Sequence, residues 1–159
     1  MIARLRHMWL ALRLAPRLLA DPALRQRLQE MRRFTRDLPA ALKAPLLDAL
    51  RRATPDRVSV PESERDLRDL ADLAALLDRA SPLGLCLRRS LTRYHFLRRS
   101  GIPVTLHFGA RFVNGQADRE VTGHAWLVLN GVPYHEDSDN WRGYSVMLSY
   151  PQEDRVTAA

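Results

Sequence analysis

Three residue types needed for a nucleophilic catalytic triad occur in order along the C-terminal half of the chain. Cys86 is the only cysteine, His124 lies in a strand-like pattern, and Glu136 and Asp137 follow a turn at Asn130-Gly131. A thiol attacks a carbonyl as thiolate, and an adjacent imidazole removes its proton and later returns it. A carboxylate bonded to the other ring nitrogen holds the imidazole in the useful tautomer.

Each of these residues also fits a structural role. A lone cysteine between two leucines is commonly a small buried apolar residue. A histidine followed by Ala-Trp can equally be a satisfied side chain within a sheet, and the chain has five histidines in all. Residue types alone therefore leave both interpretations open.

The position of Cys86 favours an activated thiol. Ser81-Pro82 is a helix-start signal, and Arg98-Arg99-Ser100-Gly101 is a cationic last turn followed by a glycine stop. Between them, apolar residues recur at helical spacing. Cys86 thus falls in the first turn of a predicted helix, where the dipole favours a thiolate.

The hairpin register decides which carboxylate can face His124. If Asn130-Gly131 is a two-residue loop, Leu129 pairs with Val132 and counting back puts Asp137 opposite His124. If Gly131 is a bulge residue, Glu136 takes that place. Neighbouring strand residues point to opposite faces, so only one of the two can serve; Asp139 is a weaker third candidate.

The elements that must position these residues are helices first and strands afterwards, which predicts an α+β fold. We expect helices over residues 2–14, 21–38, 40–53 and 63–77, and a further helix that has Cys86 in its first turn and ends at residue 99, with a linker at 54–61. Strands are expected over 104–108, 121–129, 132–136 and 144–150, with a loop at 114–119. Tyr94, Arg111, Trp126 and Trp141 are candidates to line a peptide groove, although each also suits a structural role.

Composition excludes several classes of protein. The 159 residues fit one ordinary domain with a helical extension, and a single cysteine excludes a disulfide framework or a cysteine-rich metal site. The net charge is +7, and residues 1–55 hold 12 basic and 4 acidic side chains. No nucleic-acid motif accompanies this charge. Arg13 and Arg17 interrupt the early apolar run, so we expect a soluble protein without a membrane span, and peripheral membrane contact is only a minor alternative.

The motifs together resemble a known family. The resemblance rests on Cys86-Leu87-Arg88-Arg89-Ser90-Leu91, the Gly101-Ile102-Pro103 boundary, Phe108-Gly109-Ala110-Arg111, and His124-Ala125-Trp126 before Asn130-Gly131 and Glu136. Over residues 82–137 the chain resembles the lasso-peptide maturation proteases. These are the B2-type, or C-terminal B-protein, members of the transglutaminase-like cysteine-protease superfamily.

This resemblance implies a cytoplasmic cysteine peptidase that removes the leader from a ribosomally made precursor peptide. It implies Cys86 as nucleophile, His124 as general base and acid, and Glu136 as orienting carboxylate, with Asp137 as the alternative because the family more often has Asp there. No cofactor or metal is implied. The expected partners are the precursor peptide, a separate leader-recognition protein and a macrolactam-forming cyclase.

The N-terminal part departs from the family. Fused members carry a leader-recognition module with a three-stranded sheet, whereas residues 1–80 read as helices. We therefore predict a basic helical region over 1–80, serving as a docking surface or a cover, and a transglutaminase-like (papain-like core) protease domain over 81–159.

Two other functions compete with leader removal. A transglutaminase-like acyl transferase or amidase would use the same triad with a different acyl acceptor. A non-catalytic binding module would retain the fold but have an inert Cys86.

Overall fold

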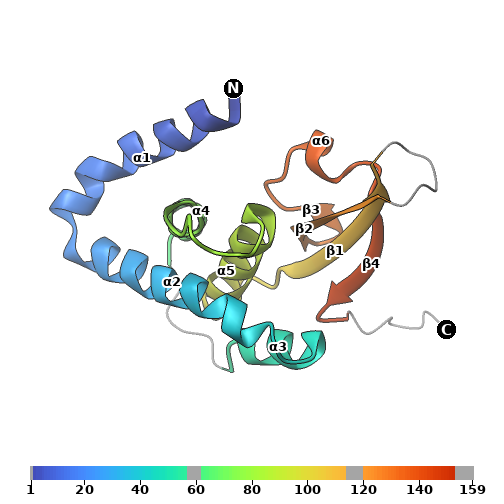
Figure 1. Cartoon of the computed structure of the whole chain (residues 1–159). Coiled ribbons are helices and arrows are strands. Elements are labelled where there is room, and N and C mark those ends of the chain that lie inside the picture. The colour runs from blue at the N-terminus through green and yellow to red at the C-terminus, as the bar shows by residue number, and fades with distance from the viewer. Residues whose placement is uncertain (1, 57–61, 114–119, 153–159) are drawn as a thin grey trace. The chain divides into compact units, whose positions relative to one another are not determined.

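The computed structural model describes residues 2–56, 62–113 and 120–152, with side chains described from residue 9 onward. Within these ranges five helices come first and four strands follow, with one short helix between the last two strands, so the fold is α+β (Figure 1). The elements are α1 (Ile2–Ala20), α2 (Pro22–Ala41), α3 (Leu46–Ala53), α4 (Glu64–Leu77), α5 (Leu85–Arg99), β1 (Thr105–Phe112), β2 (Val121–Leu129), β3 (Val132–Pro133), α6 (Ser138–Trp141) and β4 (Ser145–Tyr150).

The chain divides into two compact units, residues 1–102 and residues 103–159. The first contains α1 to α5, and the second contains the four strands and α6. The sequence-based boundary at residue 80 separates regions by expected function, and it falls between α4 and α5 of the first unit. The predicted linker at 54–61 and loop at 114–119 lie largely outside the described residues.

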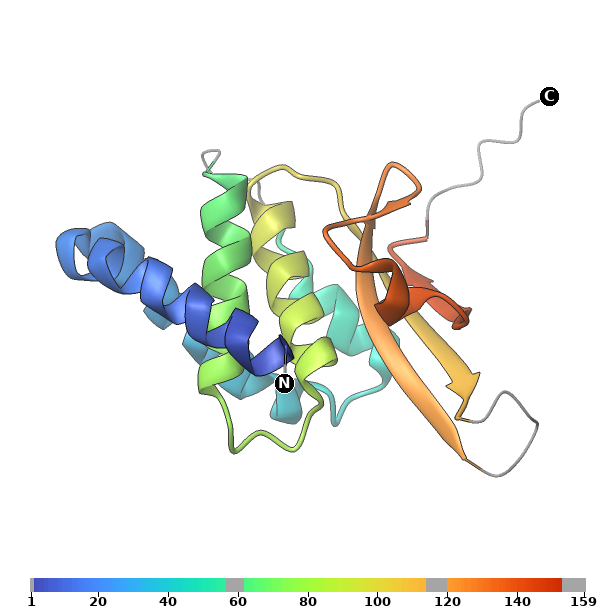
Figure 2. The same ribbon diagram turned by 90° about the horizontal axis from the view of Figure 1, so that it is seen from above.

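The core of the helical unit forms where α4 and α5 lie side by side against α2 (Figure 2). Leu67 and Leu70 of α4 and Leu91 and Leu97 of α5 are at most 2% exposed. Burying each leucine contributes about 1.5–3 kcal/mol relative to leaving it in water. This packing, predicted from the leucine spacing of both helices, fixes α5 and therefore the segment that carries Cys86.

Two helices continue past the ends predicted for them at residues 14 and 38. Prolines 16 and 39 lie inside α1 and α2, which run on to Ala20 and Ala41. The end of α1 is held by Arg25 of α2, whose guanidinium donates to the Leu18 and Leu19 carbonyl oxygens at 2.7 Å. These bonds satisfy two of the carbonyl oxygens that have no intrahelical partner at the end of α1.

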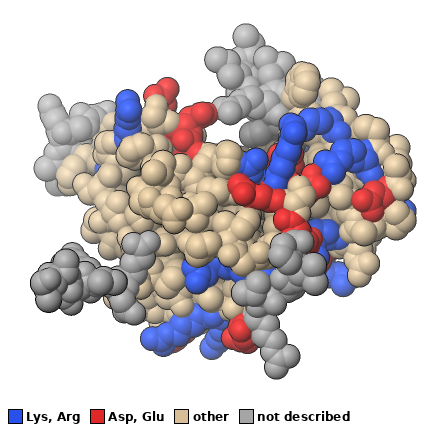
Figure 3. Space-filling view, turned by 180° about the vertical axis from the view of Figure 1, so that it is seen from behind, with Lys and Arg blue, Asp and Glu red and all other residues tan. Residues whose placement is uncertain are grey.

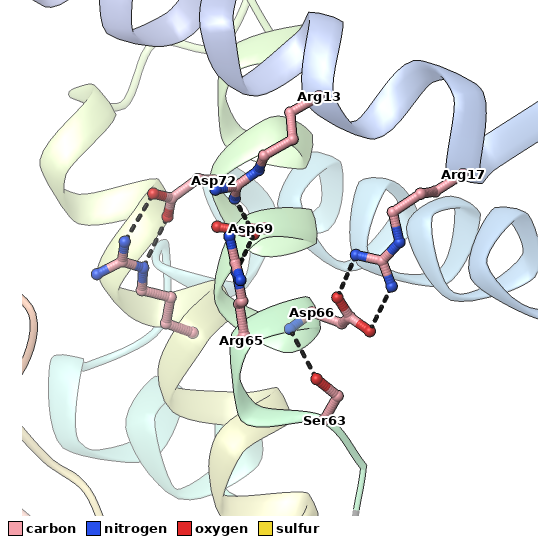
Figure 4. A network of polar contacts seen from close by, with 8 residues as sticks. Arg13, Arg17, Ser63, Arg65, Asp66, Asp69 and Asp72 are labelled. Carbon is pink, nitrogen blue, oxygen red and sulfur yellow. Dashed lines mark hydrogen bonds and ion pairs between the residues drawn. The ribbon is translucent and has the colours of Figure 1, made fainter.

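Carboxylates of α4 pair with arginines from its neighbouring helices (Figure 4). Arg17 Nη1 lies 2.6 Å from Asp66 Oδ1, and Arg13 bonds Asp69. On the other side, Arg93 of α5 binds both oxygens of Asp72 at 2.6 and 2.7 Å. Arg13 and Arg17 of the basic N-terminal stretch are therefore paired inside this unit, and Figure 3 shows basic and acidic side chains intermixed over the helices.

The sheet is antiparallel, with strand order β3-β2-β1-β4. In the β1–β2 ladder, Gly109 pairs with His124 and Arg111 with Thr122. The third strand is much shorter than the predicted 132–136 and ends at Pro133. Beyond it, His135 adopts a positive φ of 48° and the chain enters the one-turn helix α6, which the sequence did not predict.

No helix in the described ranges is both long enough and apolar enough to cross a membrane.

Candidate active site

Cys86 is the second residue of α5, in the helical unit. Gly84 is the N-cap, with φ −58° and ψ 149°, and the cysteine side chain is half-buried. The first N–H groups of a helix have no intrahelical partner and carry the positive end of its dipole, which favours an anionic sulfur. The structure thus puts the thiol where the sequence predicted it, at a position suited to a thiolate.

Arg88 holds the segment that leads into Cys86. Its side chain is buried, and Nη1 donates to the carbonyl oxygens of Ala75, at 2.8 Å, and of Asp78. These carbonyls lie at the C-terminal end of α4, so one guanidinium joins the end of α4 to the first turn of α5. The sequence placed Arg88 in a motif without revealing this function.

His124 lies on β2 of the sheet unit, beside a buried carboxylate. Its Nε2 atom is 3.5 Å from Glu136 Oε1, and the two side chains are 12% and 3% exposed. This distance is long for a hydrogen bond, but such contacts tighten when substrate binds. A proton on Nε2 directed to Glu136 would leave the Nδ1 lone pair as the base.

The carboxylate beside His124 is Glu136, although the hairpin register points to Asp137. Leu129 pairs with Val132, which is the two-residue turn whose continuation puts Asp137 opposite His124. The ladder pattern stops after Pro133, and the left-handed backbone at His135 redirects the chain. Glu136 therefore approaches His124 from outside the strand, while Asp137 becomes the N-cap of α6 and Asp139 lies within that helix.

Asn140 supports Glu136 and was missed from the sequence. Its Nδ2 donates to Glu136 Oε1 at 2.8 Å, the same oxygen that faces His124. The two residues are four positions apart, and the single turn of α6 brings them together. The four-residue spacing was the available signal, but a helix of four residues has too little periodicity to be recognised.

Aromatic rings fix the orientation of the imidazole. The His124 ring stacks on Trp126 at 5.8 Å between centroids with an interplanar angle of 16°, and it lies 5.4 Å from the Tyr144 ring. A Cβ at Gly109 would come within 2.7 Å of the Trp126 ring, so only glycine lets Trp126 cross β1 at this point. Trp126 is therefore buried support for His124, and Tyr94, fully buried, belongs to the helical core.

Among the described residues, no three His, Cys, Asp or Glu side chains form a group that could hold a metal ion.

A family model for the transglutaminase-like superfamily matches residues 30–149, which is most of the chain and includes Cys86, His124 and Glu136. The chain belongs to the transglutaminase-like superfamily. Members of this superfamily are generally enzymes of the cysteine-protease type. The match begins inside α2 and ends inside β4. No curated protein and no solved structure was found to match.

Proposed function

We propose that the protein is a transglutaminase-like cysteine peptidase that removes the leader from a ribosomally made precursor peptide. The observation that carries the proposal is a thiol in the first turn of α5, in a superfamily chain that also has a His124–Glu136 pair. The sequence resemblance over residues 82–137 supports leader removal as the particular reaction. Cys86, His124 and Glu136 act as one triad.

The reaction proceeds in two acyl-transfer steps. His124 takes the thiol proton, Cys86 attacks the scissile carbonyl, and the peptide bond breaks as His124 gives that proton to the leaving amine. Water, deprotonated by His124, then attacks the thioester and releases the leader as a carboxylic acid. Glu136 stabilises the imidazolium in both steps, and the Cys86 N–H at the helix start is a donor for the oxyanion.

The products distinguish leader removal from other reactions of the superfamily. Purified protein is incubated with a precursor peptide encoded beside its gene, with and without the leader-binding partner, and with Cys86→Ala as control. We expect two fragments whose summed mass exceeds that of the precursor by one water, and none with Cys86→Ala. An intact precursor under both conditions contradicts peptidase activity.

Acyl transfer to an amine is the second candidate, since membership of the transglutaminase-like superfamily supports it equally. The two reactions share the thioester and differ in what attacks it. Adding hydroxylamine to the same incubation tests this point, because a transferase would yield the hydroxamate in place of the acid. Failure of both reactions would favour a non-catalytic binding module.

A further inference from the structure

Arg111 lies on the same face of the sheet as His124. Directly paired residues of antiparallel strands point to the same side, and so do residues two apart along one strand. Gly109 pairs with His124, and Arg111 is two residues further along β1, paired with Thr122. The glycine contributes no side chain between them, and the space beside its backbone is occupied by the Trp126 ring and by Tyr144.

Tyr144 joins the two side chains. The Arg111 guanidinium carbon lies 4.5 Å from the centre of the Tyr144 ring, and that ring is 5.4 Å from the imidazole centre. These two distances put the guanidinium within 10 Å of the imidazole, about the span of two or three peptide residues. A group bound by Arg111 would therefore lie close to a peptide bond held beside His124.

The positive charge of Arg111 is not balanced by a carboxylate within ion-pair distance in the described part of the chain. In this it differs from Arg13, Arg17 and Arg93, each of which pairs with an aspartate. The Arg111 side chain is also exposed. Stacking one face of the guanidinium on a tyrosine orients it and leaves its edge N–H donors available, and that fork matches the two oxygens of a carboxylate.

We propose that Arg111 binds a carboxylate of the substrate beside His124 and so selects peptides that are acidic near the scissile bond. The inference rests on the proposed function, because it requires Cys86 and His124 to act on the same peptide. The carboxylate belongs either to an Asp or Glu side chain or to the C terminus of the peptide. Both present the same two oxygens to the guanidinium.

The charge of an alkylating reagent tests this directly at the single cysteine. Iodoacetate carries a carboxylate and iodoacetamide does not, so the ratio of their rates with Cys86 reports attraction of an anion. At low ionic strength we expect Arg111→Gln to lower this ratio about 2- to 10-fold, an effect that added salt reduces. Arg111→Lys, which keeps the charge, should restore most of the ratio.

Arg36→Gln is the matched control. It removes the same charge from an exposed arginine of α2 that has no carboxylate within ion-pair distance among the described residues. An equal ratio in wild type, Arg36→Gln and Arg111→Gln would overturn the proposal. The ratio can be read even from a slow thiol at high pH, so it is independent of whether His124 activates Cys86. An alkylation rate of Cys86 that does not depend on His124 contradicts the triad. A rate ratio that Arg111→Gln leaves unchanged contradicts the function of Arg111.

The source of the carboxylate is read from a cleaved peptide. Replacing one acidic side chain with its amide should lower kcat/KM about tenfold in wild type, which is the weight of one charge-assisted hydrogen bond, and only slightly in Arg111→Gln. Amidating the C terminus instead tests the terminal carboxylate.

Reversing the charge at Arg111 is a separate test. Arg111→Glu should change the preference from acidic residues to Lys or Arg at the same position of the peptide. An acidic preference that survives Arg111→Glu would overturn the proposal.

Discussion

Glu136 reaches His124 through a break in the strand, and that break decides which residue serves as carboxylate. The pairing of Leu129 with Val132 was one of two registers open from the sequence. No hydrophobic pattern, however, indicates that the pairing of β2 with β3 ends at Pro133 or that His135 adopts a left-handed backbone conformation. Both candidates were therefore predictable by type and location, whereas the choice between them depends on one backbone angle.

At this scale we expect Glu136→Gln to lower kcat/KM for peptide cleavage by about 10²–10⁴-fold, because the amide cannot stabilise the imidazolium. Asp137→Asn, the matched control on the next residue, should stay within about twofold of wild type after correction for stability, because the carboxylate beside His124 is that of Glu136. The measurement is steady-state cleavage of one peptide by the three proteins. The reverse order would assign the catalytic carboxylate to Asp137.

At the scale of elements, Arg88 couples the end of α4 to the start of α5. Arg88→Gln should lower the free energy of unfolding by about 2 kcal/mol, because the shorter side chain leaves buried carbonyls of Ala75 and Asp78 without their donor. Arg79→Gln removes the same charge from an exposed position in the intervening loop and should cost less than about 0.5 kcal/mol. Urea denaturation of both variants measures the difference, and equal losses would contradict the coupling.

His95 makes the attachment of α3 to α5 sensitive to acid. Burial lowers the pKa of His95 from 6.5, and Arg99 lowers it further, although the bond between Nδ1 and the Ala53 carbonyl and the charge of Glu30 oppose this. The depressed pKa means that the unfolded chain binds the proton more readily than the folded one. The stability contributed by neutral His95 is therefore present above 6.5 and is lost as the pH falls through 6.5 toward the folded value.

We expect the urea midpoint of the wild type to fall more between about pH 8 and about pH 5 than that of His95→Asn, whose amide can still donate to Ala53 but does not titrate. The other four histidines are present in both proteins, so the difference between the two slopes belongs to His95. Parallel slopes would show that His95 does not couple folding to pH.

At the scale of the whole molecule, the order of helices before strands follows from hydrophobic periodicity and was predicted, as was the helix that begins near Cys86. Helix ends were predicted less well. Prolines 16 and 39 lie within helices, and the end of α1 beyond Pro16 is held by the contact of Arg25 of α2 with the Leu18 carbonyl oxygen. Long-range contacts of this kind have no signature in a local stretch of sequence.

The distribution of charge could also be predicted only in part from the sequence. The basic excess of residues 1–55 is visible in the sequence, whereas the pairing of Arg13 and Arg17 with α4 is visible only in the fold. Arg32, Arg33 and Arg36 of α2 remain exposed, so docking of a partner on these helices stays a prediction.

The central claim is that Cys86 and His124 act together, and the rate of Cys86 alkylation against pH tests it most directly. Mass spectrometry reads the reaction without ambiguity because the chain has a single cysteine. In wild type we expect the alkylation rate to rise with pH and to reach its midpoint at a pH well below about 8.5, the pKa of a free thiol. In His124→Ala we expect this midpoint to move back toward that value. Identical midpoints near that value in both proteins, with and without the leader-binding partner, would contradict the claim.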